Sequence, residues 1–444
     1  MPVDPVRDAA IDVLLRVFTR DMHLDQSLDK TLRRKSMSDR GRRFMTQLVY
    51  GTVRHSLLCD YVLRPICRQP LEQFPVPILL ILRMAVFQAF FCNQVTQPAM
   101  VHTSVDLAKK RGHAGLARLV NAVLRRVPAS LEETRLPSRE ANFTDFLSIR
   151  YSTPRWLVES WQSEFGNDRA ESLCAASEVQ APVTLRVNTL KTSVEDLADH
   201  LKRSGIETQK STPIPEELTL IGAGLPVHTQ WFREGHFIFQ DPASLLPAHV
   251  LEPKPGDWVL DLCAAPGGKS THAAQLCQGQ AQILALDRDW SRLNTVKENV
   301  ERLGVGNIHV IASDSTCPPL PVSRFDRVLV DAPCSGLGTL RRHPDIKVRM
   351  NPETIRRLAE QQRALLRSGV DLCKNGGCIV YSVCTFSRQE TDEVVHSVLN
   401  DGVVKLEDGP EWLSPWKESQ GKYRTYPSEG VLDGFFLTRL RKAS

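Results

Sequence analysis

The sequence predicts a multidomain protein that begins with an all-α domain and ends with a larger α/β domain. Between residues 6 and 127, apolar side chains recur every three or four positions, which is the period of an amphipathic helix. Polar residues dominate positions 128–144 and indicate a linker. From about residue 235 onward, short apolar strands alternate with helices, which predicts a doubly wound parallel sheet.

The helical domain, residues 1–128, holds the positive charge of the chain. It contains 20 Lys and Arg against 10 Asp and Glu, a net charge of +10, whereas the whole chain carries +5. Six basic residues crowd a short stretch: Arg33, Arg34, Lys35, Arg40, Arg42 and Arg43. Such a cluster attracts phosphate backbones. A solvated helix face is the alternative that the residues leave open.

A small α/β subdomain is expected between residues 145 and 234, before the larger parallel sheet. Its pattern predicts a helix over 154–165, a strand over 183–188, a helix over 193–204 and a strand over 218–221. The third domain, residues 235–444, follows.

A nucleotide-type site is expected at the start of this third domain. An apolar strand, residues 258–262, leads into a loop rich in Ala, Pro and Gly and then into a helix that starts near Lys269. Small residues let the backbone approach a ligand, and a helix amino end offers free N–H groups. Strands over 282–286 and 308–312 end near Asp287 and Asp314, respectively. The loop matches neither the dinucleotide nor the triphosphate motif, so S-adenosylmethionine fits better.

Two cysteines follow what we interpret as two neighbouring strands of the same sheet. Cys334 closes FDRVLVDAPCSG, and Cys384 closes an apolar run that begins at Cys378. Ligands of open parallel sheets bind outside the carboxyl ends of the strands, so both thiols and Asp331 should meet over one pocket. The expected pocket therefore holds a carboxylate and two candidate nucleophiles.

Four stretches resemble a known family: DLCAAPGGKS, DAPCSGLGTLRRHPDIK, VYSVCTFSRQE and DGFFLTRL. They are similar to the RNA (cytosine-5) methyltransferases of the Nol/Nop/Sun superfamily, as are TLRVNTLK and FQDPAS upstream. RDAAIDVLLRVF, LVYGTVRH and LVNAVLRRV resemble the NusB-like helical domain of the RsmB branch. The resemblance implies a NusB-like RNA-binding domain, a small α/β pre-catalytic subdomain and a Rossmann-like methyltransferase domain.

The resemblance also assigns roles to residues. Cys384 attacks carbon 6 of cytosine, Cys334 assists breakdown of the adduct and Asp331 contacts the base edge. In DNA enzymes a Pro-Cys holds the nucleophile, so the residues alone do not rank the two cysteines. Val383 stands where the family usually has Thr. S-adenosylmethionine would be held by a set that also includes Asp331: Cys263, Ala264, Ala265, Pro266, Gly267, Gly268, Lys269, Asp287 and Asp314.

Two of these assignments leave alternatives. Lys269 would meet the cofactor carboxylate or pair with a nearby acid. Arg341, Arg342 and His343 would meet RNA phosphates or lie in a surface loop.

Composition and resemblance together bound the function. Eleven cysteines without paired C-x-x-C spacing predict a reduced, cytoplasmic protein without a zinc site, and the apolar run 76–92 is too short to span a bilayer. We expect a monomer that methylates carbon 5 of a cytosine in 16S ribosomal RNA. A transfer-RNA methyltransferase and a non-catalytic RNA-binding assembly factor are the alternatives.

Overall fold

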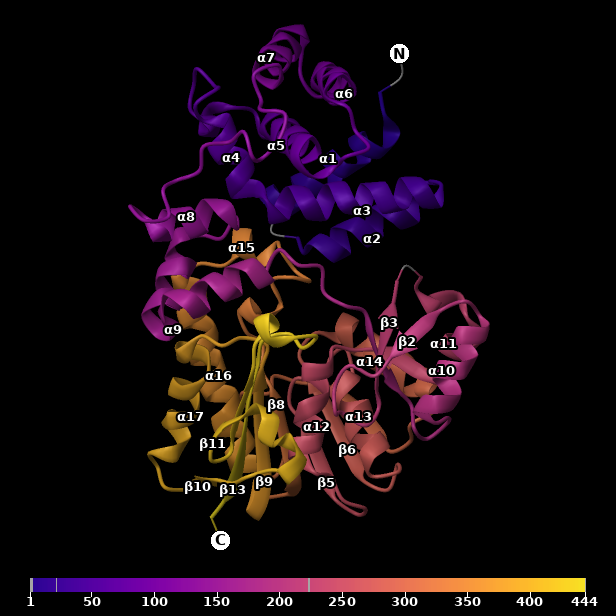
Figure 1. Cartoon of the computed structure of the whole chain (residues 1–444). Coiled ribbons are helices and arrows are strands. Elements are labelled where there is room, and N and C mark those ends of the chain that lie inside the picture. Colours follow the sequence, from indigo (N-terminus) through magenta and orange to yellow (C-terminus); the bar gives the residue numbers. More distant parts are fainter. Residues whose placement is uncertain (1–2, 21, 223, 444) are drawn as a thin grey trace. The chain divides into compact units, whose positions relative to one another are not determined.

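A computed structural model describes residues 3–20, 22–222 and 224–443, which divide into two compact units (Figure 1). Unit 1 comprises Met1–Val179 and Leu340–Met350, and unit 2 comprises Gln180–Thr339 and Asn351–Ser444. The chain therefore leaves unit 2 for eleven residues and then returns to it.

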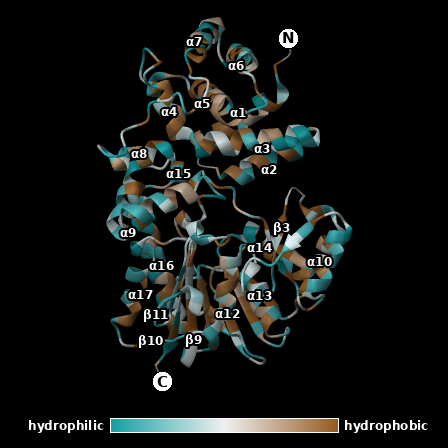
Figure 2. Cartoon of the chain, in the orientation of Figure 1, coloured by the Kyte–Doolittle hydropathy of each residue, from teal (hydrophilic) through white to brown (hydrophobic). Residues whose placement is uncertain are grey.

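Unit 1 is helical, which confirms the prediction for the amino-terminal domain. Its α-helices are α1 (Pro5–Arg20), α2 (Leu24–Arg34), α3 (Asp39–Arg54), α4 (Ser56–Leu63), α5 (Val76–Phe91), α6 (Gln97–Arg111), α7 (Ala114–Leu124), α8 (Phe143–Arg150), α9 (Arg155–Ala176) and α15 (Ile346–Arg349). Many carry hydrophobic and hydrophilic residues on the same helix (Figure 2). The apolar run forms α5, whose buried side chains join the core. Among the described helices, none is long and apolar enough to cross a membrane.

The segment Leu340–Met350, which we call the inserted segment, is built into unit 1. The buried Asp345 carboxylate accepts a 3.4 Å hydrogen bond from the backbone N–H of Leu24, at the start of α2. Lys347 Nζ donates to the backbone oxygen of Tyr151 at 2.9 Å. Arg341 is 4% exposed, so its expected place on a surface loop or against RNA phosphates is wrong.

Unit 2 contains a small antiparallel sheet in the order β2-β3-β1-β4. Its strands are β1 (Thr184–Val187), β2 (Glu207–Gln209), β3 (Glu217–Ile221) and β4 (Phe237–Phe239). The helix α10 (Val194–Arg203) covers it through Leu197 and Leu201, which pack with buried strand residues. After the fourth strand, the chain forms the helix α12 (Leu246–Leu251) and then enters the second sheet of unit 2.

In the part of the chain that the structure describes, the second sheet of unit 2 has nine strands, with the path β11-β12-β13-β9-β8-β5-β6-β7 and β10 beside β13. The bounds are β5 (Trp258–Asp261), β6 (Gln282–Asp287), β7 (Ile308–Ala312), β8 (Phe325–Asp331), β9 (Cys373–Val383), β10 (Val404–Leu406), β11 (Lys417–Ser419), β12 (Lys422–Thr425) and β13 (Phe435–Lys442). Strands β5 to β9 are parallel, which confirms the predicted Rossmann-like sheet. Strands β10 to β13 extend this sheet with antiparallel pairs, which the sequence analysis did not predict. The connection from β12 to β13 is too short for the crossover that parallel strands need.

Helices cover both faces of this sheet (Figure 1). One face packs against α16 (Pro352–Leu372) and α17 (Asp392–Leu399), and the other against α12 (Leu246–Leu251) and α13 (Gly268–Leu276). The helix α14 (Trp290–Leu303) packs beside α13. Apolar strands are thus buried between two layers, as in doubly wound folds.

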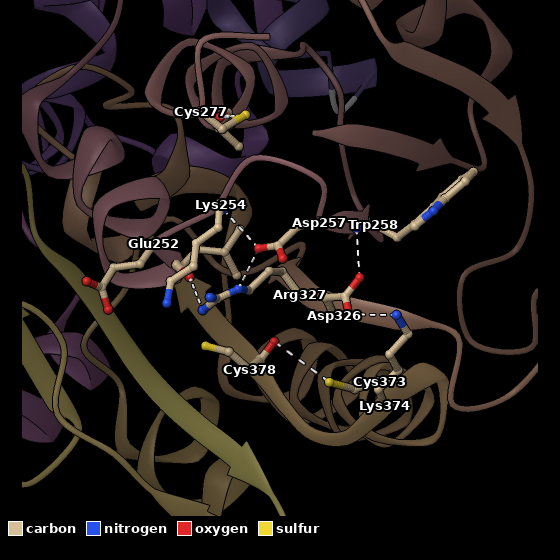
Figure 3. A network of polar contacts seen from close by, with 12 residues as sticks. Glu252, Lys254, Asp257, Trp258, Cys277, Asp326, Arg327, Cys373, Lys374 and Cys378 are labelled. Carbon is tan, nitrogen blue, oxygen red and sulfur yellow. Dashed lines mark hydrogen bonds and ion pairs between the residues drawn. The ribbon is translucent and has the colours of Figure 1, made fainter. Parts of the chain in front are cut away.

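Polar side chains tie the strands together at their amino ends (Figure 3). Asp326 accepts hydrogen bonds from the Trp258 backbone N–H at 2.9 Å and from Lys374 Nζ at 2.6 Å. Arg327 Nε donates to Asp257 at 2.9 Å. These contacts join β5, β8 and β9 at the edge opposite the carboxyl ends, so they stabilise the sheet and leave the other edge for ligands.

Candidate active site

The two predicted thiols meet at the carboxyl ends of β8 and β9. These strands are parallel neighbours, with Asp331 opposite Ser382, so the loops that follow open on the same edge. Cys334 Sγ lies 3.2 Å from Cys384 Sγ, and both side chains are partly exposed. The hydrogen bond with Cys384, together with burial, raises the pKa of the Cys334 thiol well above its ordinary value. Cys334 therefore favours the protonated form.

A charged pair stands beside the thiols. Lys269 Nζ donates to Asp331 Oδ2 at 2.6 Å, and Ser382 Oγ donates to Asp331 Oδ1 at 2.8 Å. Burial opposes the charge on Lys269, but the Asp331 carboxylate prevails and raises the lysine pKa. Of the two roles expected for Lys269, the structure shows the pairing with an acid.

Residues 262–267, which we call the glycine loop, join β5 to α13 in the predicted order of strand, loop and helix, and they contact β6. The Ala264 N–H donates to the Leu286 backbone oxygen at 2.8 Å. Gly267 has φ of 99°, and a Cβ there would lie 3.2 Å from Val296 Cα. A left-handed residue in such a tight space favours glycine. The loop therefore brings backbone N–H groups and the amino end of α13 to the ligand edge.

Asp261, at the end of β5, supports this loop from below and was not among the predicted residues. Its carboxyl accepts hydrogen bonds from Ser270 Oγ at 2.6 Å and from the Cys263 N–H at 3.2 Å. Burial raises the pKa of Asp261 to about 7, and the charge of Asp331 acts in the same direction. The sequence does not reveal this, because burial depends on the helices that cover the sheet.

Asp287 and Asp314 follow the next two strands. The Asp287 carboxylate accepts hydrogen bonds from the backbone N–H of Ala265 at 3.3 Å and of Asp289 at 3.0 Å. It is thereby joined to the glycine loop. Asp314 is exposed beyond β7 and accepts hydrogen bonds from the Thr316 N–H and hydroxyl. Next to it, Ser315 Oγ donates to the Leu262 backbone oxygen at 2.5 Å, which holds this loop against the end of β5.

A buried glutamate, Glu390, joins the two loops that carry the thiols, residues 332–336 after β8 and 384–387 after β9, which we call the cysteine loops. Sequence reasoning missed this residue. Its carboxylate accepts hydrogen bonds from Ser335, Thr385 and Gln362. The Tyr381 hydroxyl donates to the Glu390 backbone oxygen at 2.6 Å. Glu390 lies inside the VYSVCTFSRQE stretch, but no local pattern marks a charged residue there as buried.

Glu216, His249 and His272 form a second buried cluster with the donor types of a metal site. Glu216 Oε1 lies 2.5 Å from His272 Nε2 and 2.8 Å from His249 Nε2. Two ligands at about 2.0 Å from one zinc in tetrahedral geometry lie about 3.3 Å apart, so these shorter separations are those of direct contacts: a hydrogen bond with His249 and an ion-pair contact with His272. The cluster thus links the start of β3 to α12 and α13.

Comparison with known proteins identifies the family. Models of the "16S rRNA methyltransferase RsmB/F", "NusB family" and "Methyltr_RsmF/B-like, ferredoxin-like domain" match residues 248–441, 4–128 and 153–228. The "probable ribosomal RNA small subunit methyltransferase B" of Bacillus subtilis is 35% identical, over 98% of both chains. The chain belongs to the ribosomal RNA small subunit methyltransferase B family. A member from Thermus thermophilus is 34% identical, over 99% of this chain and 98% of its own.

Solved structures agree with this membership. The crystal structure of PH0851 aligns with a TM-score of 0.84 at 27% identity, over 99% of this chain and 100% of its own. The structure of "NSun6 from Pyrococcus horikoshii with SFG" aligns with a TM-score of 0.60 at 26% identity, over 66% of this chain and 98% of its own. The human "28S rRNA (cytosine(4447)-C(5))-methyltransferase" is 34% identical over 76% of this chain and 43% of its own length.

Proposed function

We propose that this protein transfers a methyl group from S-adenosylmethionine to carbon 5 of one cytosine in 16S ribosomal RNA. The observation that carries the proposal is the pair of thiols 3.2 Å apart, beside a lysine–aspartate pair, at the ligand edge of the sheet. The names of the family's members support ribosomal RNA as the substrate class. We further propose that it acts as a monomer in the cytoplasm.

The chain's own residues fit the cofactor. The glycine loop, the amino end of α13 and Asp287 meet at one edge, as an adenosine-containing ligand requires. The predicted set would hold it: Cys263, Ala264, Ala265, Pro266, Gly267, Gly268, Lys269, Asp287, Asp314 and Asp331. When bound, the cofactor supplies an electrophilic methyl group on a sulfonium.

The cysteines divide the work on the base. The Cys384 thiolate forms a bond to carbon 6, which makes carbon 5 nucleophilic enough to take up the methyl group. Asp331 contacts the protonatable edge of the ring and favours protonation at nitrogen 3. Carbon 5 and nitrogen 3 then release their protons to water, and the sulfur–carbon bond breaks with Cys384 leaving as a thiolate, which restores the aromatic ring. Cys334, held as a thiol, assists this last stage by donating a hydrogen bond to the departing Cys384 sulfur.

In this proposal, unit 1 binds the RNA. A surface hollow there is lined in part by Arg7, Arg40, Arg43 and Gln47. Arg40 and Arg43 are exposed, as expected of side chains that bind phosphate groups. The target cytosine must leave any base stack to reach the thiols, so it lies in a loop or is flipped out.

Substitution of each cysteine tests the proposal. With Cys384→Ala we expect no methyl transfer and no covalent RNA complex, because the attacking thiol is absent. With Cys334→Ala we expect a covalent complex that resolves slowly, visible as a retarded band of labelled RNA on a denaturing gel. The reverse pattern would make Cys334 the nucleophile. Bisulfite sequencing of ribosomal and transfer RNA from a deletion strain separates the two RNA substrates, and no lost methylation would favour an assembly factor.

A further inference from the structure

The carboxylate of Glu390 collects hydrogen bonds from both cysteine loops. It lies in a short 3-10 helix, Arg388–Glu390, and is 0% exposed. Its Oε1 accepts from the Ser335 N–H at 2.8 Å and from Gln362 Nε2 at 3.0 Å. Its Oε2 accepts from Ser335 Oγ at 2.5 Å and from Thr385 Oγ1 at 3.3 Å. Four donors thus converge on one buried acid.

The donors are the immediate neighbours of the thiols. Ser335 follows Cys334, and Thr385 follows Cys384. Gln362 also donates to the backbone oxygen of Pro333 at 2.9 Å, on the other side of Cys334. We propose that Glu390 is a positioning residue that sets the separation of the two thiols, and so keeps Cys334 within reach of the adduct formed by Cys384. The inference rests on the proposed function, whose site it deepens.

The buried donors around Glu390 require a hydrogen-bond acceptor at this position. Without one, the Ser335 N–H and one N–H of the Gln362 amide would remain buried and unpaired, which is costly, so the loops would shift. A glutamine can replace the glutamate in shape, because its carbonyl takes the place of Oε1 and its NH₂ donates to hydroxyls that rotate.

Disulfide formation in the full-length protein measures the thiol separation directly. A diazenedicarboxamide oxidant takes two electrons and two protons from the two thiols and becomes a hydrazine, while one sulfur–sulfur bond forms. From 3.2 Å the sulfurs need to approach by only about 1 Å to reach bond length, so we expect rapid closure in the wild type. Mass spectrometry of the linked tryptic peptides, residues 328–341 and 375–388, gives the rate.

We expect Glu390→Ala to slow this closure at least about tenfold, because the two loops lose their shared acceptor. Glu390→Gln should restore the rate to within about twofold. The matched control is Tyr381→Phe, which removes buried hydrogen bonds to the Glu390 backbone oxygen and to Gln362 Oε1 but leaves all four donors to the Glu390 carboxylate in place. It should also stay within about twofold. Thermal melting and cofactor binding confirm that each variant is folded.

A folded Glu390→Ala variant that closes the disulfide at the wild-type rate would overturn the proposal. If that variant does not fold, Ser335→Ala and Thr385→Val decide, since each removes one hydroxyl that donates to Glu390. Slower closure in both supports the positioning role, and wild-type rates in both refute it. The assay uses neither RNA nor methyl transfer, so failure of the proposed methylation would leave its result intact. In single-turnover methylation, Glu390→Ala should slow release of the adduct more than its formation.

Discussion

Replacement of Asp261 by asparagine should stabilise the protein, and the gain should depend on pH. The folded protein raises the pKa of this carboxyl from 3.8 to about 7, mainly through burial. Well below pH 3.8 the acid is protonated in both the folded and the unfolded state, so its ionisation takes nothing from the free energy of unfolding there. As the pH rises toward 7, the unfolded chain loses the proton while the folded chain keeps it, and the free energy of unfolding falls. Above 7 the penalty stays constant, at about 4 kcal/mol.

Asparagine avoids this penalty without disturbing the loop. Its carbonyl can accept from the Cys263 N–H, and its NH₂ can donate to Ser270 Oγ. We therefore expect Asp261→Asn to match the wild type near pH 4 and to exceed its unfolding free energy by up to about 4 kcal/mol near pH 8. Urea unfolding at a series of pH values measures the difference.

Asp326→Asn is a matched control, for which we expect a change in stability of the opposite sign. Asp326 pairs with Lys374 at the amino end of the same sheet, and although burial opposes its charge, the lysine lowers its pKa. Asp326→Asn should therefore destabilise the protein at neutral pH and lose this effect in acid. An Asp261→Asn variant whose stability relative to the wild type is the same at both ends of the pH range would refute the reasoning.

Two further predictions concern ligands. Asp287→Ala should weaken S-adenosylmethionine binding by about 1.5 to 3 kcal/mol, the usual cost of lost hydrogen bonds to a charged group. Calorimetry on the folded variant measures the change, and an unchanged affinity would mean that Asp287 is not part of the cofactor site. Replacement of Arg40 and Arg43 by glutamine should reduce the slope of log affinity against log salt by about 1.5 in filter binding to ribosomal RNA. The control double variant, Arg118→Gln with Arg125→Gln, removes the same charge from other exposed positions of unit 1. Equal slopes in the two double variants would show that the hollow lined by Arg40 and Arg43 is not the RNA-binding surface.

The sequence predicts local elements well where one pattern decides them. The strands over 282–286 and 308–312 emerge as β6 and β7, because their apolar runs are bounded by polar residues. The same reasoning brings Cys334, Cys384 and Asp331 to one edge, since neighbouring parallel strands end together. Their catalytic roles stay predictions, which the substitutions above test.

What the sequence does not predict depends on partners far along the chain. Glu390 and Glu216 look like ordinary surface acids in the sequence, yet both are buried by residues from several elements. The direction of β13 is another example, because an apolar run such as DGFFLTRL fits a parallel and an antiparallel strand equally well. Similarly, the helix expected over 154–165 continues as α9 to Ala176, across a break at Gly166 with φ of 80°.

Contacts of the inserted segment make arginine substitutions a better test of RNA binding by the basic domain than deletion of that domain. Deletion of residues 1–128 would remove the basic domain proposed to bind RNA and would leave the glycine loop, which lies in later residues, in the protein. However, Asp345 accepts its hydrogen bond from Leu24, and Arg54 Nη2 donates to the Arg341 backbone oxygen at 2.7 Å. The deletion would strip these partners from a segment that begins only six residues after Cys334. A truncated protein that loses activity would therefore not distinguish lost RNA binding from a disturbed cysteine loop, whereas the paired arginine substitutions keep the segment packed and do distinguish them.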